Sequence, residues 1–208
     1  MFRSIKNHFN RKNLKDEKYS FLFEKNETNS EYVCFDCETT GLDPLVDDIV
    51  SIGAVIIKDN TILASKKFIR YVKPKTCFLN AESIKIHHIR ECDLLDACDI
   101  EDVILEFLKF IGNRPLVGYF LDFDMRMVNK YLKPQLGINL PNKTFEVSEI
   151  YHDHKIEIIP QAFIDLRFNS ILKDLNIPSL GVHDSFNDAL MTAMIFLKLK
   201  NSSNVKIK

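Results

Sequence analysis

The chain has 208 residues, of which 46% are hydrophobic and 27% charged, with a formal net charge of −1 at pH 7. This balance predicts a soluble globular protein with one core, and it excludes a disordered chain or a strongly basic nucleic-acid coat protein. No stretch reaches the roughly 18 apolar residues of a membrane span and no apolar signal segment is present, so we expect a cytoplasmic protein without a membrane partner.

Residues 1–30 are rich in lysine and arginine and carry only scattered apolar positions. We interpret them as a basic arm or as a helix docked on the body, with a substrate-binding arm as the alternative. The pattern changes at Glu31. We therefore expect one domain over residues 31–200, followed by a tail over residues 201–208.

Three strands are predicted at the start of this domain. Residues 31–37 contain the apolar run Tyr32-Val33-Cys34-Phe35, and residues 49–57 and 62–72 are rich in β-branched side chains. Asp59 and Asn60 separate the second and third runs, and this pair is typical of a hairpin turn.

The pattern becomes helical after Pro74. Helices are predicted over "AESIKIHHI" and "IEDVILEFLKFIG", with Asn80 and Asp99 as their N-terminal caps. The segment "RPLVGYF" is predicted to be a short strand. It precedes a helix over "DFDMRMVNKYLKPQLG", which we expect to end at Pro134 and Gly137.

In the remaining third of the chain, the sequence pattern is least clear between residues 141 and 160. Residues 141–160 are predicted to be a strand or a loop, and residues 162–175 a helix stopped by Pro178. A last helix is predicted from about residue 185 to residue 200. Strands followed by alternating helices and strands favour an α/β fold with one mixed sheet covered by helices.

Two carboxylates, Asp36 and Glu38, end the first predicted strand in the string "YVCFDCETTGLDP". Residues two apart on a strand share a face, so both side chains point the same way. Like charges that close repel each other unless a cation lies between them, and Mg²⁺ suits oxygen ligands. The alternative interpretation is a pair of surface acids at a strand end.

Further acids lie at the starts of two predicted helices. Asp122 and Asp124 follow "PLVGY", and we expect Asp122 to cap the helix and Asp124 to point toward the sheet edge. In "GVHDSFNDALMTAMIFLK", Asp188 follows Ser185 at the spacing of a capping box, which is compatible with metal binding. His183 would then lie beside the metal as a proton acceptor.

Cysteine and histidine pairs offer alternative metal sites. Cys34 and Cys37 have the Cys-x-x-Cys spacing, but on a strand they point to opposite faces. We interpret them as core residues, with a zinc site as the alternative. His152 and His154 lack an evident third ligand, so a metal site there is not favoured.

Taken in order, "FDCETTGLD", "LVGYFLDFDMRMVNKYL" and "HDSFNDALMTAMIF" resemble the three exonuclease motifs of the DEDDh (DnaQ-like) family. "IKIHHIRECDLL" resembles its Ile-His-Gly-Ile segment. The family includes the proofreading epsilon subunit of bacterial replicative DNA polymerase, ribonuclease T and oligoribonuclease. The resemblance spans about residues 31–200 and implies a ribonuclease-H-like fold, with a mixed five-stranded sheet and helices on both faces.

The resemblance also implies roles for single residues. It places Asp36, Glu38, Asp124 and Asp188 on the family's carboxylates that hold two divalent ions, Mg²⁺ or Mn²⁺. It places His183 on the general base that takes a proton from the attacking water. Such an arrangement supplies the charge cancellation that phosphodiester cleavage requires.

Substrate contacts are carried over in the same way. Backbone amides of the "TTGL" turn and the Leu42 side chain would meet the terminal nucleotide, although an ordinary turn is the alternative. Tyr119-Phe120 replaces the family's His-Asn, so a polar contact near the site is either lost or replaced by stacking. His88 replaces a glycine, which histidine tolerates because it sometimes adopts positive φ. The expected contact residues are Thr39, Thr40, Gly41, Leu42, His87, Tyr119 and Phe120, with a structural helix-end role as the alternative for His87.

We therefore expect a metal-dependent 3′→5′ exonuclease that removes nucleoside 5′-monophosphates from single-stranded or frayed DNA. Its expected partner is a DNA 3′ end, with RNA as the alternative. For a protein partner, a DNA polymerase subunit and none at all both stay open. An exoribonuclease that trims short RNA or tRNA ends is the alternative enzyme. A catalytically silent nucleic-acid or polymerase-binding module is the alternative of another class, against which the presence of all five catalytic positions argues.

Overall fold

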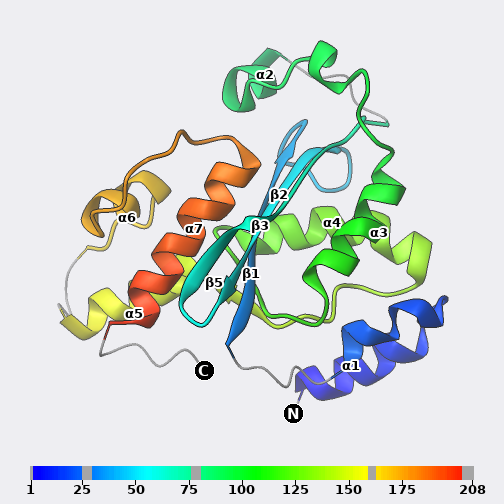
Figure 1. Cartoon of the computed structure of the whole chain (residues 1–208), viewed down its shortest axis with the longest axis horizontal. Coiled ribbons are helices and arrows are strands. Elements are labelled where there is room, and N and C mark those ends of the chain that lie inside the picture. The colour runs from blue at the N-terminus through cyan, green and yellow to red at the C-terminus, as the bar shows by residue number, and fades with distance from the viewer. Residues whose placement is uncertain (1, 25–29, 76–80, 159–162, 203–208) are drawn as a thin grey trace.

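The computed structural model describes residues 2–24, 30–75, 81–158 and 163–202. Within them, five strands form one sheet in the order β3-β2-β1-β4-β5 (Figure 1). β1 pairs antiparallel with β2 and parallel with β4, which confirms the predicted mixed sheet. The strands are β1 (Glu31–Thr39), β2 (Ile49–Lys58), β3 (Thr61–Tyr71), β4 (Leu116–Gly118) and β5 (Thr144–Glu146).

Helices cover both faces of the sheet, with α3 and α4 on one side and α5 and α7 on the other (Figure 1). No helix in the described part of the chain is long and apolar enough to cross a membrane. The helices are α1 (Phe2–Lys12), the 3-10 helix η1 (Glu17–Phe23), α2 (Ala81–His87), the 3-10 helix η2 (Glu91–Leu94), α3 (Ile100–Ile111), α4 (Leu121–Leu136), α5 (Val147–Ile158), α6 (Phe168–Asp174) and α7 (Ser185–Lys200).

Side chains of β1 alternate between two hydrophobic cores. Val33, Phe35 and Cys37 belong to the core beneath α3 and α4, whereas Tyr32 and Cys34 belong to the core beneath α5 and α7. Both cysteines are buried free thiols. Their place in different cores confirms that they are core residues and not a zinc site.

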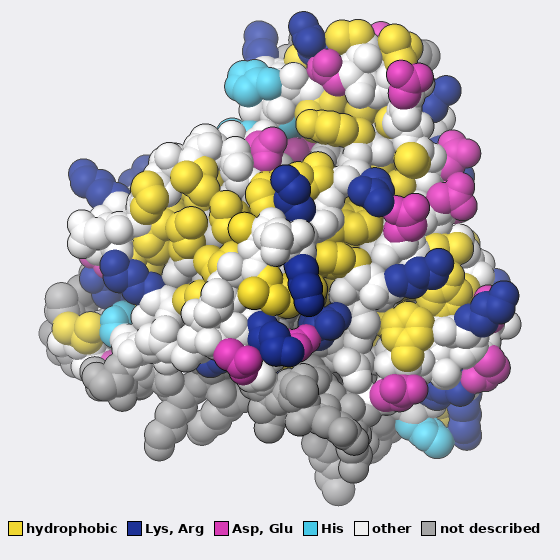
Figure 2. Space-filling model, in the orientation of Figure 1, with side chains coloured by type: hydrophobic (Ala, Val, Ile, Leu, Met, Phe, Trp, Pro, Cys, Tyr) yellow, Lys and Arg dark blue, Asp and Glu magenta, His cyan; other side chains and the backbone are white. Residues whose placement is uncertain are grey.

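The hairpin between β2 and β3 forms where the sequence predicts it. Asp59 and Asn60 have φ values of 48° and 61°, the left-handed pair that a two-residue hairpin turn requires. β3 is an edge strand with exposed Lys66, Lys67 and Arg70, and such charges disfavour pairing with another chain. Figure 2 shows basic side chains dispersed among apolar ones over the visible face.

The N-terminal segment contacts the loop after α4. The Asn10 amide donates to the Asn139 carbonyl at 2.7 Å, and Asn10 Oδ1 accepts from the Asn139 backbone N–H at 3.0 Å. Gly137 has φ +77°, and a Cβ there would lie 2.2 Å from the Asn13 carbonyl oxygen. Glycine is therefore required where the two segments meet.

The predicted end of α4 is wrong in one respect. Pro134 lies inside the helix, which continues to Leu136 and is capped by Gly137 in the left-handed region. Pro134 removes a single backbone donor, and the last turn is still closed by the Gly137 backbone N–H, which donates to the Lys133 carbonyl at 2.9 Å. The cap at Gly137 agrees with the prediction.

The interpretation of residues 141–160 as a strand or loop is also wrong for most of its length. Only β5 is extended, and α5 follows it directly, with Val147 and Tyr151 buried one turn apart.

α6 is shorter than predicted because Asp165 accepts hydrogen bonds from the Arg167 N–H and the Ser170 hydroxyl, which favours a local turn. The predicted helix start at residue 162 and the Asn80 cap lie outside the described residues.

Two helices agree with their predicted positions. α7 spans Ser185–Lys200 as expected, and α3 begins directly after Asp99. Asp99 occupies the N-cap position, but its side chain makes no capping hydrogen bond. The candidate active site lies where β1, α4 and α7 meet.

Candidate active site

The first pair of acids lies at the C-terminal end of β1. Asp36 and Glu38 share a face of the strand, as predicted, and both line one cavity. The parallel strand β4 ends beside them, and α4 starts just after it. Asp124, in the first turn of α4, is buried, and its Oδ1 accepts from the backbone N–H of Cys37 at 3.2 Å. The second predicted motif is thus bonded to the first.

The fourth acid, Asp188, lies in the first turn of α7. Gly53 on β2 pairs with Asp36 in the sheet, and a Cβ at Gly53 would lie 2.3 Å from the backbone carbon of Ser185. The missing side chain lets α7 begin directly on the sheet. The hydroxyl oxygens of Ser51 and Ser185 lie 2.7 Å apart in the same buried contact. This contact brings Asp188 to the acids of β1.

Three of these acids can share a cation. Asp36, Glu38 and Asp188 each offer a carboxylate oxygen within 4.8 Å of the others, the sole such group among the described residues. Asp188 Oδ2 accepts from the His183 backbone N–H at 2.9 Å, while its buried Oδ1 has no hydrogen-bond partner within the described part of the chain. An oxygen-only cluster with an unsatisfied buried oxygen fits a hard divalent cation.

Burial and mutual repulsion shift the ionisation of the cluster. Burial, followed by repulsion from Asp188 and Asp184, raises the pKa of Glu38 to about 8. Burial also raises the pKa of Asp188 to about 6. The pKa values of Asp36 and Asp124 lie well above their usual range, chiefly because both groups are buried. Without a cation, burial and mutual repulsion therefore favour the protonated forms of these acids, and a bound cation would favour the ionised forms.

The acids open into a cavity of about 560 Å³. Among its lining residues are eight that the sequence predicted: Asp36, Glu38, Leu42, Tyr119, Phe120, Asp124, His183 and Asp188. The five proposed catalytic positions, distant in sequence, therefore share one cavity with three of the proposed substrate contacts.

The other predicted contacts, Thr39, Thr40, Gly41 and His87, do not line this cavity. The Thr39 hydroxyl donates to the Gly41 carbonyl at 2.7 Å, and the Thr40 backbone N–H donates to the Asp48 carbonyl at 2.9 Å. These groups stabilise their own loop. The buried His87 accepts from the Ile89 backbone N–H through Nδ1 at 3.0 Å, and burial lowers its pKa.

The predicted cap of α4 is wrong. The helix begins at Leu121, whose backbone N–H donates to Glu146 Oε2 at 2.9 Å. Glu146 comes from β5, so tertiary structure supplies the cap. Asp122 is exposed and pairs instead with Arg126 at 2.5 Å.

The predicted cap of α7 is wrong as well. The N-cap residue is Asp184, whose side chain accepts from the Asn187 backbone N–H at 2.9 Å. Ser185 and Asp188 therefore do not form the capping box that their spacing suggested. Asp188 is left with one oxygen for His183 and one for the cavity.

Backbone strain is present at the cavity wall. Phe120 and His183 have φ values of 56° and 66°, and the Phe120 side chain is 70% exposed. The left-handed region is unfavourable for bulky side chains, and such strain is concentrated at functional sites. His88 has φ 59°, which confirms that histidine is accommodated where the family has glycine.

Sequence reasoning missed several residues that line the cavity. Phe123 lies between two acids that were considered, and its position beside Asp124 could have drawn attention to it. The α6 residues carry no motif, so only the folded chain brings them to the cavity. The missed residues are Cys37, Phe123, Phe168, Asn169, Val182 and Thr192.

Proteins of known families are similar to this chain in sequence. The profile of the RNase_T family, described as "Exonuclease", matches residues 33–196. DNA polymerase III subunit epsilon of Aquifex aeolicus is 27% identical over 189 residues, which cover 89% of this chain and 88% of that protein. DNA polymerase III PolC-type of Thermotoga petrophila is 29% identical over 173 residues, which cover 82% of this chain but 12% of the relative. The chain thus spans only a small part of the PolC-type relatives.

Solved structures share the fold. Cell-death related nuclease 4 superposes with a TM-score of 0.72 at 16% identity, over 84% of this chain and 64% of that one. Exonuclease X in complex with 5′ overhanging duplex DNA superposes with a TM-score of 0.65 at 22% identity, over 84% and 94% of the respective chains. These similarities confirm the predicted ribonuclease-H-like fold.

Proposed function

The chain belongs to this exonuclease family, and from that membership we propose that it is a metal-dependent 3′→5′ exonuclease acting on single-stranded or frayed DNA ends. The convergence of Asp36, Glu38, Asp124 and Asp188 with His183 on one cavity carries the proposal. The products would be nucleoside 5′-monophosphates.

The four carboxylates would hold two divalent cations, Mg²⁺ or Mn²⁺. When bound, such ions activate water and offset the negative charge that develops on the phosphate. The Oδ1 of Asp188 has no hydrogen-bond partner among the described residues, and the pKa values of Glu38 and Asp188 are raised. Both observations support this assignment, because they show that the ionised carboxylates need a counter-charge.

His183 would act as the general base. Its side chain lines the cavity, and its backbone N–H is bonded to Asp188, so the position of the imidazole is tied to the acid cluster. An imidazole can accept a proton from an attacking water near neutral pH. The exposed location of His183 leaves a route by which that proton reaches solvent.

Apolar side chains would bind the end of the strand. Leu42 and Phe120 are exposed at the cavity, and an exposed ring offers a face on which a base can stack. The Tyr119 ring is held in place, because its hydroxyl donates to the Leu166 carbonyl at 2.9 Å and its ring centroid lies 4.9 Å from that of Phe168. We therefore assign base stacking to Phe120 and the supporting wall to Tyr119.

A DNA polymerase is the proposed partner. The support is the similarity to the epsilon subunit of DNA polymerase III along nearly its whole length. Binding of the chain to a purified polymerase subunit by size-exclusion chromatography would test this part separately from catalysis.

The activity itself is tested with DNA and RNA oligonucleotides of one sequence, labelled at the 5′ end, in Mg²⁺, Mn²⁺ or EDTA. We expect a ladder that shortens from the 3′ end of DNA, dependent on metal and absent in Asp36→Asn. Faster shortening of RNA would assign the exoribonuclease alternative. Intact substrate in every metal would leave the catalytically silent binding module.

A further inference from the structure

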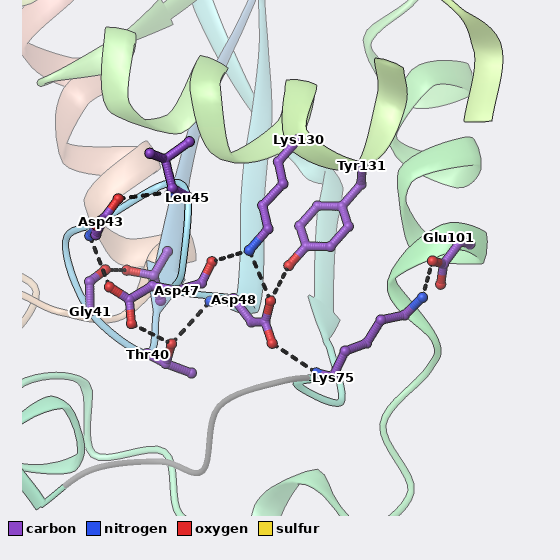
Figure 3. Close-up of polar contacts among 11 residues, drawn as sticks. Thr40, Gly41, Asp43, Leu45, Asp47, Asp48, Lys75, Glu101, Lys130 and Tyr131 are labelled. Atoms are coloured by element: carbon purple, nitrogen blue, oxygen red, sulfur yellow. Dashed lines mark hydrogen bonds and ion pairs between the residues drawn. The ribbon is translucent and has the colours of Figure 1, made fainter. Parts of the chain in front are cut away.

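The loop at residues 40–48 joins β1 to β2 (Figure 3). Its Leu42 is one of the residues that line the cavity. The loop folds around the Asp47 carboxylate, which accepts from the Thr40 hydroxyl at 3.0 Å and from the Asp43 backbone N–H at 2.8 Å. A Cβ at Gly41 would lie 2.5 Å from the same carboxylate. The internal shape of the loop is therefore closely fixed.

Asp48 ties this loop to the rest of the molecule. Asp48 is 2% exposed, and its carboxylate Oδ1 accepts hydrogen bonds from the Tyr131 hydroxyl at 2.6 Å and from Lys130 Nζ at 3.1 Å. Its other oxygen accepts from the Lys75 backbone N–H at 2.9 Å, and Lys130 Nζ also donates to the Asp47 carbonyl at 2.7 Å. Figure 3 shows these groups converging between the loop and α4.

Lys130 and Tyr131 lie on the same helix as Phe123 and Asp124, both of which line the cavity. One helix, α4, therefore carries both the partners of the loop and residues of the cavity wall. Asp48, Lys130 and Tyr131 thus connect the cavity wall formed by Leu42 with the wall formed by α4. None of these three residues lines the cavity.

We propose that Asp48, Lys130 and Tyr131 form a positioning cluster that holds the 40–48 loop against α4 and thereby places Leu42 on the terminal nucleotide of the substrate. The proposal rests on the proposed function. Buried charge-assisted hydrogen bonds of this kind fix geometry because breaking one leaves a buried carboxylate with too few donors. The three residues would act through Leu42 and not on the reacting atoms.

Tyr131→Phe is the first test, because it removes one hydroxyl and retains the ring. The loss of a hydrogen bond to a charged group should raise KM for a single-stranded oligonucleotide about five- to tenfold, while kcat changes less than about twofold. Amide hydrogen exchange over residues 40–48 should become faster. Lys130→Gln, which removes a second donor to the same carboxylate, should change KM in the same direction.

Tyr151→Phe is the matched control. Tyr151 also donates its hydroxyl to an aspartate, Asp174, but it lies on α5 within the opposite core. This variant should lose comparable stability with KM and loop exchange unchanged. A rise in KM equal to that of Tyr131→Phe would show that general destabilisation is responsible and would overturn the proposal.

A double-mutant cycle tests whether the cluster acts through Leu42. Leu42→Ala alone should raise KM, and adding Tyr131→Phe should raise it by less than about twofold more. Independent, multiplied effects would overturn the positioning role while leaving the nuclease assignment intact. An inactive wild-type chain would instead overturn both, and unchanged loop exchange in Tyr131→Phe would overturn the inference without any reference to activity.

Discussion

Glu38→Gln removes one negative charge from the acid cluster while keeping the size of the side chain. Glu38 is 8% exposed, and burial together with Asp188 and Asp184 raises its pKa from 4.5 to about 8. The folded chain without metal therefore binds this proton more tightly than the unfolded chain does. The resulting stabilisation is fully present below pH 4.5 and is lost as the pH rises to about 8.

The size of the effect follows from the pKa shift. One pKa unit corresponds to about 1.4 kcal/mol, so ionising Glu38 in the metal-free protein costs up to about 5 kcal/mol. Water in the open cavity screens part of this charge, and we expect Glu38→Gln to raise the free energy of unfolding by about 2 to 4 kcal/mol at high pH. Each kcal/mol corresponds to about 2–4 °C in Tm for a chain of this size.

Thermal unfolding in EDTA between about pH 4.5 and pH 8.5 measures the effect. The two proteins should have similar Tm values at the acidic end, and the variant should be more stable at the alkaline end. Glu149→Gln, at an exposed position on α5, is the control and should follow the wild type throughout. Added Mg²⁺ should stabilise the wild type more than Glu38→Gln. Parallel pH profiles for wild type and Glu38→Gln would refute the reasoning.

Three further predictions concern the cavity. His183→Ala should lower kcat about 10²- to 10⁴-fold, the usual contribution of a general base, with Mg²⁺ binding by calorimetry retained; an unchanged kcat would exclude that role. Phe120→Asn should raise Tm in a melting experiment, because asparagine tolerates the left-handed backbone, yet weaken single-stranded DNA binding about fivefold or more through lost stacking; unchanged binding would contradict the stacking assignment. Asp124→Asn should abolish metal-dependent cleavage and Asp122→Asn should not, and the reverse result would place the second motif in another register.

The sequence predicts those parts of the site that depend on local periodicity. Alternation along β1 puts Asp36 and Glu38 on one face, and the apolar stripe after Ser185 predicts the full extent of α7. Both follow from backbone geometry that hardly varies among proteins. The convergence of these elements was indicated by the order of the motifs and is confirmed by the shared cavity.

The missed features depend on contacts between distant segments. Glu146 caps α4 from a neighbouring strand, and no local rule connects it with Leu121. Phe168 reaches the cavity from a short helix whose start is set by Asp165. The sequence alone does not distinguish the roles of Thr39 and Thr40 in the "TTGL" turn. Only the fold shows that the Thr40 hydroxyl donates to the Asp47 carboxylate and accepts from the Asp48 backbone N–H. Tertiary partners decided each of these positions.

The contact at Gly53 has a consequence for how the protein tolerates sequence change. Because the start of α7 touches the main chain of β2 there, the separation between Asp188 and the acids of β1 is set by the thickness of two backbones. Substitutions in either core can alter side-chain packing without changing that thickness. Substitutions in the two hydrophobic cores should therefore leave the dimensions of the acid cluster unchanged. A single methyl group added at position 53 would instead push α7 away from β2 and widen the acid cluster directly.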